Sequence, residues 1–99
     1  MKKRYIVCVN DSNKEQDNLF IEYLRLNGLG WWHYIDNFWL LTDASGKLSA
    51  AVIRDKLNEI YSIRNMVIEI SQNSDNWAGF GPKNETENMF DWIKKNWKK

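Results

Sequence analysis

Side chains that could bind a ligand are concentrated in residues 30–43, which hold three of the six tryptophans and the only histidine of the chain. Aromatic rings stack on nucleic-acid bases with about 1–3 kcal/mol per base. An imidazole can accept a proton or hold a phosphate near neutral pH. A later loop, residues 77–82, is also aromatic and rich in glycine. The candidate ligand-binding residues are Trp32, His33, Tyr34, Trp39, Trp77 and Phe80.

The single histidine restricts the chemistry of this stretch. A typical zinc site needs several histidine or cysteine ligands, whereas the chain has one histidine and one cysteine, so no metal site is predicted there. His33 could act as a general base, but we favour a structural histidine that is hydrogen-bonded in an edge strand. Cys8 lies in an apolar, strand-like run and is predicted to be a small buried side chain rather than a reactive thiol.

Asp11 is a candidate catalytic residue because it follows the first predicted strand. An aspartate at this point, repeated in a second copy of the chain, could hold Mg²⁺ or Mn²⁺ for phosphodiester hydrolysis. Together with Ser12, it fits an ordinary loop that leads into a helix equally well. The sequence has no catalytic carboxylate pair, glycine-rich phosphate loop, nucleophile elbow or HExxH motif. Enzymatic activity is therefore left open, and no cofactor is expected outside the metal-dependent case.

Apolar and β-branched runs predict four strands. Residues 4–9 form a continuous apolar run that is typical of a buried strand. Residues 30–43 are typical of a β-hairpin, because two apolar runs flank the Asp-Asn pair at 36–37, and these residues tolerate the positive φ of a tight turn. Residues 65–71 supply the fourth strand, and residues 77–82 could add a short edge strand.

Three helices are predicted from apolar residues at helical spacing. The first covers residues 13–27, with Ser12 and Glu15 as its capping box. The second is capped by Ser49 and runs over residues 50–61. The last helix has Thr86 or Asn84 as its cap and a stripe of apolar side chains: Met89, Phe90, Ile93 and Trp97.

The order strand, helix, strand, strand, helix, strand predicts an α+β fold of the ferredoxin-like βαββαβ type, with a four-stranded antiparallel sheet. The 99 residues make a single domain, with its core over residues 4–71 and a C-terminal loop and helix over residues 72–99. Both faces of the two central strands are apolar, but two helices normally cover one face. The C-terminal helix or a second copy of the chain must cover the other, so we predict a homodimer.

A two-residue turn assigns the hairpin side chains to two faces. The first face is predicted to carry Trp32, Tyr34, Trp39 and Leu41. The second is predicted to carry Trp31, His33, Ile35, Phe38, Leu40 and Thr42. The first group could stack on a base, but packing in the core or between two copies is the interpretation that we favour.

The net charge of +1 argues against a dedicated nucleic-acid-binding domain, which is usually strongly basic. The two chain ends nevertheless hold half of the basic residues, and all acidic residues lie between Asp11 and Asp91. If the ends meet, they form a basic patch that could contact phosphates, although we favour solvated terminal lysines. No apolar run is long enough for a membrane span or a signal peptide, so we expect a cytoplasmic protein without membrane contact.

The hairpin and the second helix resemble small bacterial proteins labelled SinR-like. The residues that carry the resemblance are Trp-Trp-His-Tyr-Ile-Asp at 31–36, Trp-Leu-Leu at 39–41, Ser-Ala at 49–50 and Ile-Arg-Asp-Lys-Leu at 53–57. Such proteins look like distant relatives of the CRISPR adaptation protein Cas-two, and the resemblance, over about residues 5–80, implies its ferredoxin-like fold and a homodimer. In the wider family, an aspartate that ends the first strand is the proposed metal-binding nuclease residue. The aligned position here is Asn10 or, with one residue of slack, Asp11.

Three hypotheses about function follow. The one that we favour is a small dimeric module that binds a nucleotide-like ligand or nucleic acid through the hairpin aromatics and the loop at 77–80. The second is a metal-dependent nuclease with Asp11 at the seam between two copies. The third is a protein-interaction module, for example an inhibitor carried by a mobile element, that binds a host protein through its acidic body or exposed aromatics.

Overall fold

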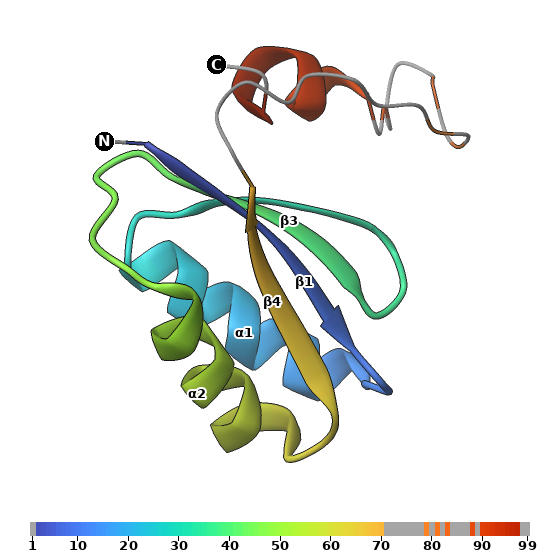
Figure 1. Ribbon diagram of the computed structural model, residues 1–99. Coiled ribbons are helices and arrows are strands. Elements are labelled where there is room, and N and C mark those ends of the chain that lie inside the picture. The colour runs from blue at the N-terminus through green and yellow to red at the C-terminus, as the bar shows by residue number, and fades with distance from the viewer. Residues whose placement is uncertain are drawn as a thin grey trace.

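The computed structural model describes residues 2–70, 79, 81, 83, 88 and 90–97 and shows an α+β fold (Figure 1). The elements are β1 (Lys3–Val9), α1 (Lys14–Leu26), β2 (Gly30–Ile35), β3 (Phe38–Asp43), α2 (Ala50–Tyr61), β4 (Asn65–Ile70) and the π-helical segment η1 (Ile93–Trp97). The strands form one antiparallel sheet in the order β2-β3-β1-β4. The predicted α+β class and the four-stranded antiparallel sheet are confirmed.

The capping box of α1 lies one residue later in the chain than predicted. Asn13 is the N-cap: its side chain accepts a hydrogen bond from the backbone N–H of Gln16 at 2.8 Å, and the Gln16 side chain accepts one from the backbone N–H of Asn13 at 3.1 Å. The prediction that Ser12 and Glu15 form this box is therefore wrong. The Ser12 hydroxyl donates instead to the side-chain oxygen of Asn37 at 2.7 Å, which ties the start of α1 to the hairpin turn.

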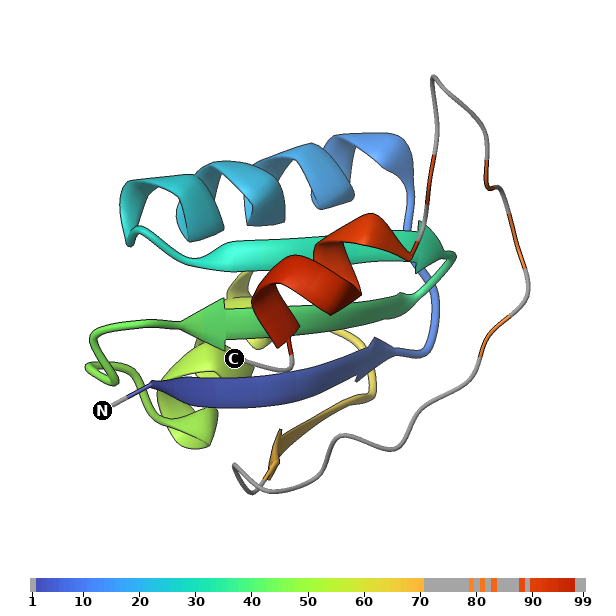
Figure 2. The same ribbon diagram turned by 90° about the horizontal axis from the view of Figure 1, so that it is seen from above.

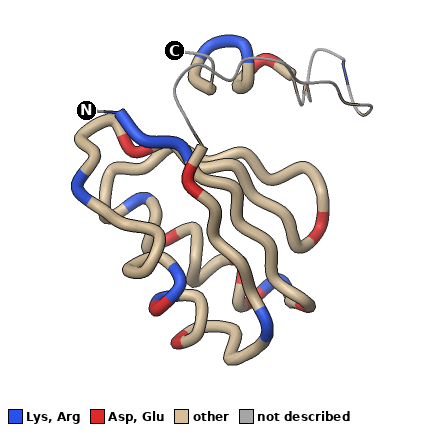
Figure 3. The backbone as a smooth tube through the Cα atoms, in the orientation of Figure 1, with Lys and Arg blue, Asp and Glu red and all other residues tan. Residues whose placement is uncertain are grey.

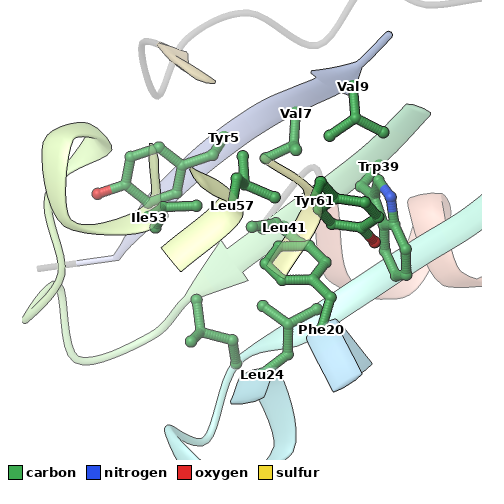
Figure 4. Packing of buried hydrophobic residues seen from close by; sticks show 11 residues of the cluster. Tyr5, Val7, Val9, Phe20, Leu24, Trp39, Leu41, Ile53, Leu57 and Tyr61 are labelled. Atoms are coloured by element: carbon green, nitrogen blue, oxygen red, sulfur yellow. The ribbon is translucent and has the colours of Figure 1, made fainter. Parts of the chain in front are cut away.

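The sheet has a helix layer on one face and the C-terminal segment on the other. The helices α1 and α2 lie side by side on the first face, whereas η1 crosses the second face, here called the open face (Figures 1 and 2). The main core lies between the sheet and the two helices, and it consists of Tyr5, Val7, Val9, Phe20, Leu24, Leu29, Trp39, Leu41, Ile53, Leu57 and Tyr61 (Figure 4).

A second, smaller cluster attaches the C-terminal segment to the open face. It joins Trp32 and Leu40 of the sheet to Ile93 and Trp97 of η1. The side chain of Asn88 accepts hydrogen bonds from two backbone N–H groups at the start of this segment, those of residues 90 and 91, at 2.9 and 3.2 Å. Several predicted features lie outside the described residues: the caps Asn84 and Thr86, the stripe residue Met89, and the loop aromatics Trp77 and Phe80.

Candidate functional site

A β-bulge in β2 rearranges the aromatic side chains of the hairpin. The paired residues are Ile35 with Phe38, Trp32 with Leu40 and Trp31 with Leu41. Two residues of β2, His33 and Tyr34, therefore lie opposite the single residue Trp39 of β3, which is the pattern of a bulge. The predicted tight turn is present, with a φ of 65° at Asn37.

The bulge moves two tryptophans to the faces opposite those predicted, because one extra residue reverses the alternation of side chains beyond it. Trp32 packs beneath η1, and Trp31 packs against the main core. The predicted aromatic face does not form, since Trp39 and Leu41 belong to the main core. Trp32 and Tyr34 remain together, with their ring centroids 5.5 Å apart.

The candidate ligand-binding residue Trp39 lies entirely inside the protein. Its side chain has no exposed surface, and its indole meets the ring of Phe20 edge-on, with 5.0 Å between centroids (Figure 4). Trp32 is buried as well, beneath η1. Of the four hairpin candidates, Tyr34 is the exposed one, so the described hairpin offers one aromatic side chain to a ligand rather than a cluster.

His33 is hydrogen-bonded within the hairpin and stacked on the core. Its Nδ1 lies 2.9 Å from the carbonyl oxygen of Phe38, and its Nε2 lies 3.4 Å from Asp17 Oδ2 on α1. The hydroxyl of Tyr61 donates to the other oxygen of Asp17 at 2.7 Å. Burial and then this carboxylate raise the pKa of the Tyr61 hydroxyl well above its usual range. Asp17 thus links α1 to α2 and to β2, a contact between distant segments that no local sequence pattern signals.

Asp11 is exposed at the start of the loop before α1. One of its carboxylate oxygens accepts a hydrogen bond from the backbone N–H of Ser12 at 2.8 Å. Across the described part of the chain, no three histidine, cysteine, aspartate or glutamate side chains gather closely enough to hold a metal ion. A metal site at this position would therefore need the Asp11 carboxylate of a second copy as well. The nuclease hypothesis stays a prediction.

Four uncharged side chains form a straight row across the open face, here called the apolar row. The register places Ile35 beside Phe38, Phe38 beside Cys8, and Cys8 beside Met66. Met66 is 59% exposed, Ile35 is 49% exposed, Cys8 is exposed and Phe38 is half-buried. The prediction that Cys8 is buried is wrong, because its side chain points to the open face and the C-terminal segment packs on other residues.

The next row along the strands, here called the covered row, consists of Trp32, Leu40, Ile6 and Ile68. The first three of these belong to the cluster that holds the C-terminal segment, as does Phe38 of the apolar row, whereas Ile68 on the edge strand is 49% exposed. The contribution of β4 to the open face is not among the predicted features. The signal was available, because Met66, Ile68 and Ile70 alternate along the strand and must share a face.

Residues 2–4 lie close to η1 at one end of the sheet (Figure 3), whereas Lys98 and Lys99 of the predicted basic patch lie outside the described residues. Arg4 at the start of β1 donates to the carbonyl oxygen of Trp97 at 3.1 Å, and its guanidinium lies 5.1 Å from the centroid of the Trp97 ring. The Lys2 ammonium donates to the carbonyl oxygen of Asn96. Both contacts satisfy carbonyl groups at the C-terminal end of a helix. Two further lysines, at 94 and 95, are exposed on the same segment η1 that Lys2 and Arg4 contact.

Within the described residues, no helix is both long and apolar enough to cross a bilayer. Comparison of the chain with protein-family models, with curated proteins and with solved structures finds no match. The resemblance to SinR-like proteins and to Cas-two therefore stays a prediction.

Proposed function

We propose that the chain is a dimeric interaction module in which two copies join through the apolar row. The observation that carries the proposal is the row itself, with Cys8 and Met66 exposed beside the half-buried Phe38. A sheet face that meets water normally carries polar side chains, and a contiguous exposed apolar patch marks an interaction site. The exposed ends of the row and the neighbouring Ile68 extend this patch toward both edges of the sheet.

A second copy of the chain is the partner that fits this surface. A two-fold axis brings a surface against itself, so a patch with charged groups would meet like charges, whereas an uncharged row does not. Methionine and aromatic side chains are enriched at the centres of protein interfaces. The row crosses four strands spaced about 4.8 Å apart, and its width of about 14 Å suits the central part of an interface.

The ferredoxin-like βαββαβ arrangement is part of the same proposal. The strand order β2-β3-β1-β4 and two helices on one face support it. Such a layout leaves the second face of a small sheet without a helix layer. We infer that the C-terminal segment and a second copy cover this face together.

The mass of the chain in solution tests this proposal. We expect about twice 11.8 kDa for the unmodified chain at micromolar concentration by sedimentation or light scattering, and about 11.8 kDa for Met66→Glu, which places a charge in the row. Leu26→Glu is the matched control, because Leu26 is 70% exposed on α1 in the opposite layer. An unmodified chain that stays monomeric, or a Met66→Glu variant that still dimerises, would contradict the proposal.

A second candidate function is favoured by the contacts of Lys2 and Arg4 with η1. Lys2, just before β1, contacts the Asn96 carbonyl of η1, on which Lys94 and Lys95 are exposed, although the acidic residues of the chain lie between its two basic ends. We infer that the surface with these lysines contacts the phosphate backbone of a nucleic acid, which would give binding that is independent of sequence and falls with salt. This function retains the nucleic-acid part of the sequence-based hypothesis and assigns the contact to basic residues instead of the hairpin aromatics.

Binding of labelled oligonucleotides over a range of salt concentrations tests this second function. Reversal of two charges in Lys94→Glu/Lys95→Glu is expected to weaken binding and to reduce the salt slope by about 0.7–0.9 for each lost phosphate contact. Arg54→Glu/Arg64→Glu changes the net charge equally on exposed residues of another surface and serves as the control. Equal losses in both double variants would show that net charge, rather than this surface, is responsible.

A further inference from the structure

The C-terminal segment covers an apolar surface that continues directly into the apolar row. Ile6 lies two residues before Cys8 on β1, and Leu40 lies two residues after Phe38 on β3, so the covered row and the apolar row are adjacent on the same face. Ile93 and Trp97 of η1 pack on the covered row. Without this segment, both rows would form one uninterrupted apolar surface across the sheet.

The attachment of this segment depends on its contacts with the sheet. A helical stretch as short as residues 91–97 is too short to be stable alone, and the π-helical geometry of Ile93–Trp97 is less favourable than α-helical geometry. Apolar and polar contacts, the latter including the hydrogen bond from Lys2 to the Asn96 carbonyl, hold it in place. Apolar packing joins Ile93 and Trp97 to the covered row, and the buried Arg4 fixes the end of the segment through the Trp97 carbonyl and ring.

We propose that η1 is an autoinhibitory strap on the dimerisation surface. When docked, it limits the contact between two copies to the apolar row. When released, it adds the covered row to the interface, and the larger apolar area strengthens self-association. This inference rests on the proposed function, because it assumes that the open face binds a second copy, and it adds a means of regulating that contact.

The test uses the full chain with Ile93→Asp, which places a charge in the apolar packing of the strap and leaves every residue of the sheet unchanged. Amide hydrogen exchange of residues 93–97 reports release of the strap, and sedimentation equilibrium measures the dimer dissociation constant. We expect faster exchange together with dimerisation that is about tenfold tighter or more, a change of about 1.4 kcal/mol. Leu26→Asp, on the outer surface of α1, is expected to change neither quantity.

Two results would overturn the proposal: exchange that does not accelerate, or accelerated exchange with an unchanged or weaker dimer. If Ile93→Asp does not fold, Arg4→Met decides in its place. It removes the hydrogen bond to Trp97 and the cation–π contact, and a smaller change in the same direction is expected. If Met66→Glu abolishes the dimer but Ile93→Asp does not strengthen it, the strap proposal is contradicted and the proposed function is supported. If the unmodified chain is monomeric and dimerises only in Ile93→Asp, the strap proposal is supported and the proposed function of the unmodified chain is contradicted.

Discussion

The imidazole of His33 lies flat against the indole of Trp39, with 3.7 Å between the ring centroids and 3° between the planes. The bulge in β2 makes this contact, because it turns His33 toward the helix-covered face, where Trp39 is fully buried. The histidine thereby covers Trp39 at the edge strand β2, and its Nε2 lies 3.4 Å from Asp17 on α1. The most chemically suggestive residue of the sequence has a structural role in the fold.

Loss of the imidazole should therefore destabilise the protein. His33→Ala removes the stacking contact with Trp39 and the polar contacts with Phe38 and Asp17, and we expect the free energy of unfolding to fall by about 1–3 kcal/mol. Tyr34→Ala is the matched control, since Tyr34 is the other bulge residue and is exposed. Urea unfolding measures both, and a loss in Tyr34→Ala as large as that in His33→Ala would contradict this role.

The buried carboxylate of Asp43 should make stability depend on pH in acid. Burial by itself raises the pKa of this carboxyl, but hydrogen bonds from Leu48 N–H, the Ser45 hydroxyl and Gly46 N–H outweigh burial and hold the pKa below its usual value. Since the pKa is lower in the folded state, the stabilisation is present above the ordinary value of about 4 and is lost as the pH falls through the folded-state value.

Asp43→Asn should accordingly be less stable than the unmodified chain at neutral pH, by about 1–3 kcal/mol. This difference is expected to shrink as the pH falls below about 4, where the carboxyl of the unfolded chain becomes neutral, and to be lost as the pH falls through the lower folded-state pKa. Thermal unfolding over this pH range measures the effect. A difference that stays constant down to the lowest pH would show that the charge of Asp43 does not act through these hydrogen bonds.

Gly30 is required by the close approach of its neighbours on the open face. A Cβ atom at this position would lie 2.6 Å from the Thr42 hydroxyl oxygen and 3.3 Å from a ring carbon of Trp92. Gly30→Ala should destabilise the protein by about 1–3 kcal/mol through overpacking, and Thr42→Ala should restore part of this loss. Gly28→Ala should also be unfavourable, because Gly28 has a φ of 70°, but Thr42→Ala should not rescue it. Unfolding of the single and double variants measures the coupling, and its absence at Gly30 would contradict the predicted clash.

Local signals in the sequence predict the elements of this fold well. The periodicity of residues 13–27 and 49–61 and the Asp-Asn turn place α1, α2 and the hairpin close to their observed bounds. Local signals do not predict the bulge, because the insertion of one residue into the β2–β3 pairing depends on how Trp39 and His33 pack against α1. A single inserted residue then reverses the predicted faces of Trp31 and Trp32.

The candidate surfaces could be predicted in part. The apolar character of both sides of β1 and β3 correctly indicated a second face that needs cover. The extent of that cover depends on where the C-terminal segment docks, and this in turn depends on Arg4 and Trp97, which lie far apart in the sequence. The exposure of Cys8 therefore could not be derived from its apolar surroundings in β1.

The reactivity of Cys8 tests the central claim most directly, because it is the only cysteine of the chain and lies within the apolar row. Its alkylation rate under native conditions, with the reagent in excess, can be followed by mass spectrometry as the concentration of the chain is raised. We expect the rate to fall in parallel with dimer formation, and to stay high at every concentration in Met66→Glu. A dimer in which Cys8 reacts as fast as in the monomer would contradict the proposed interface.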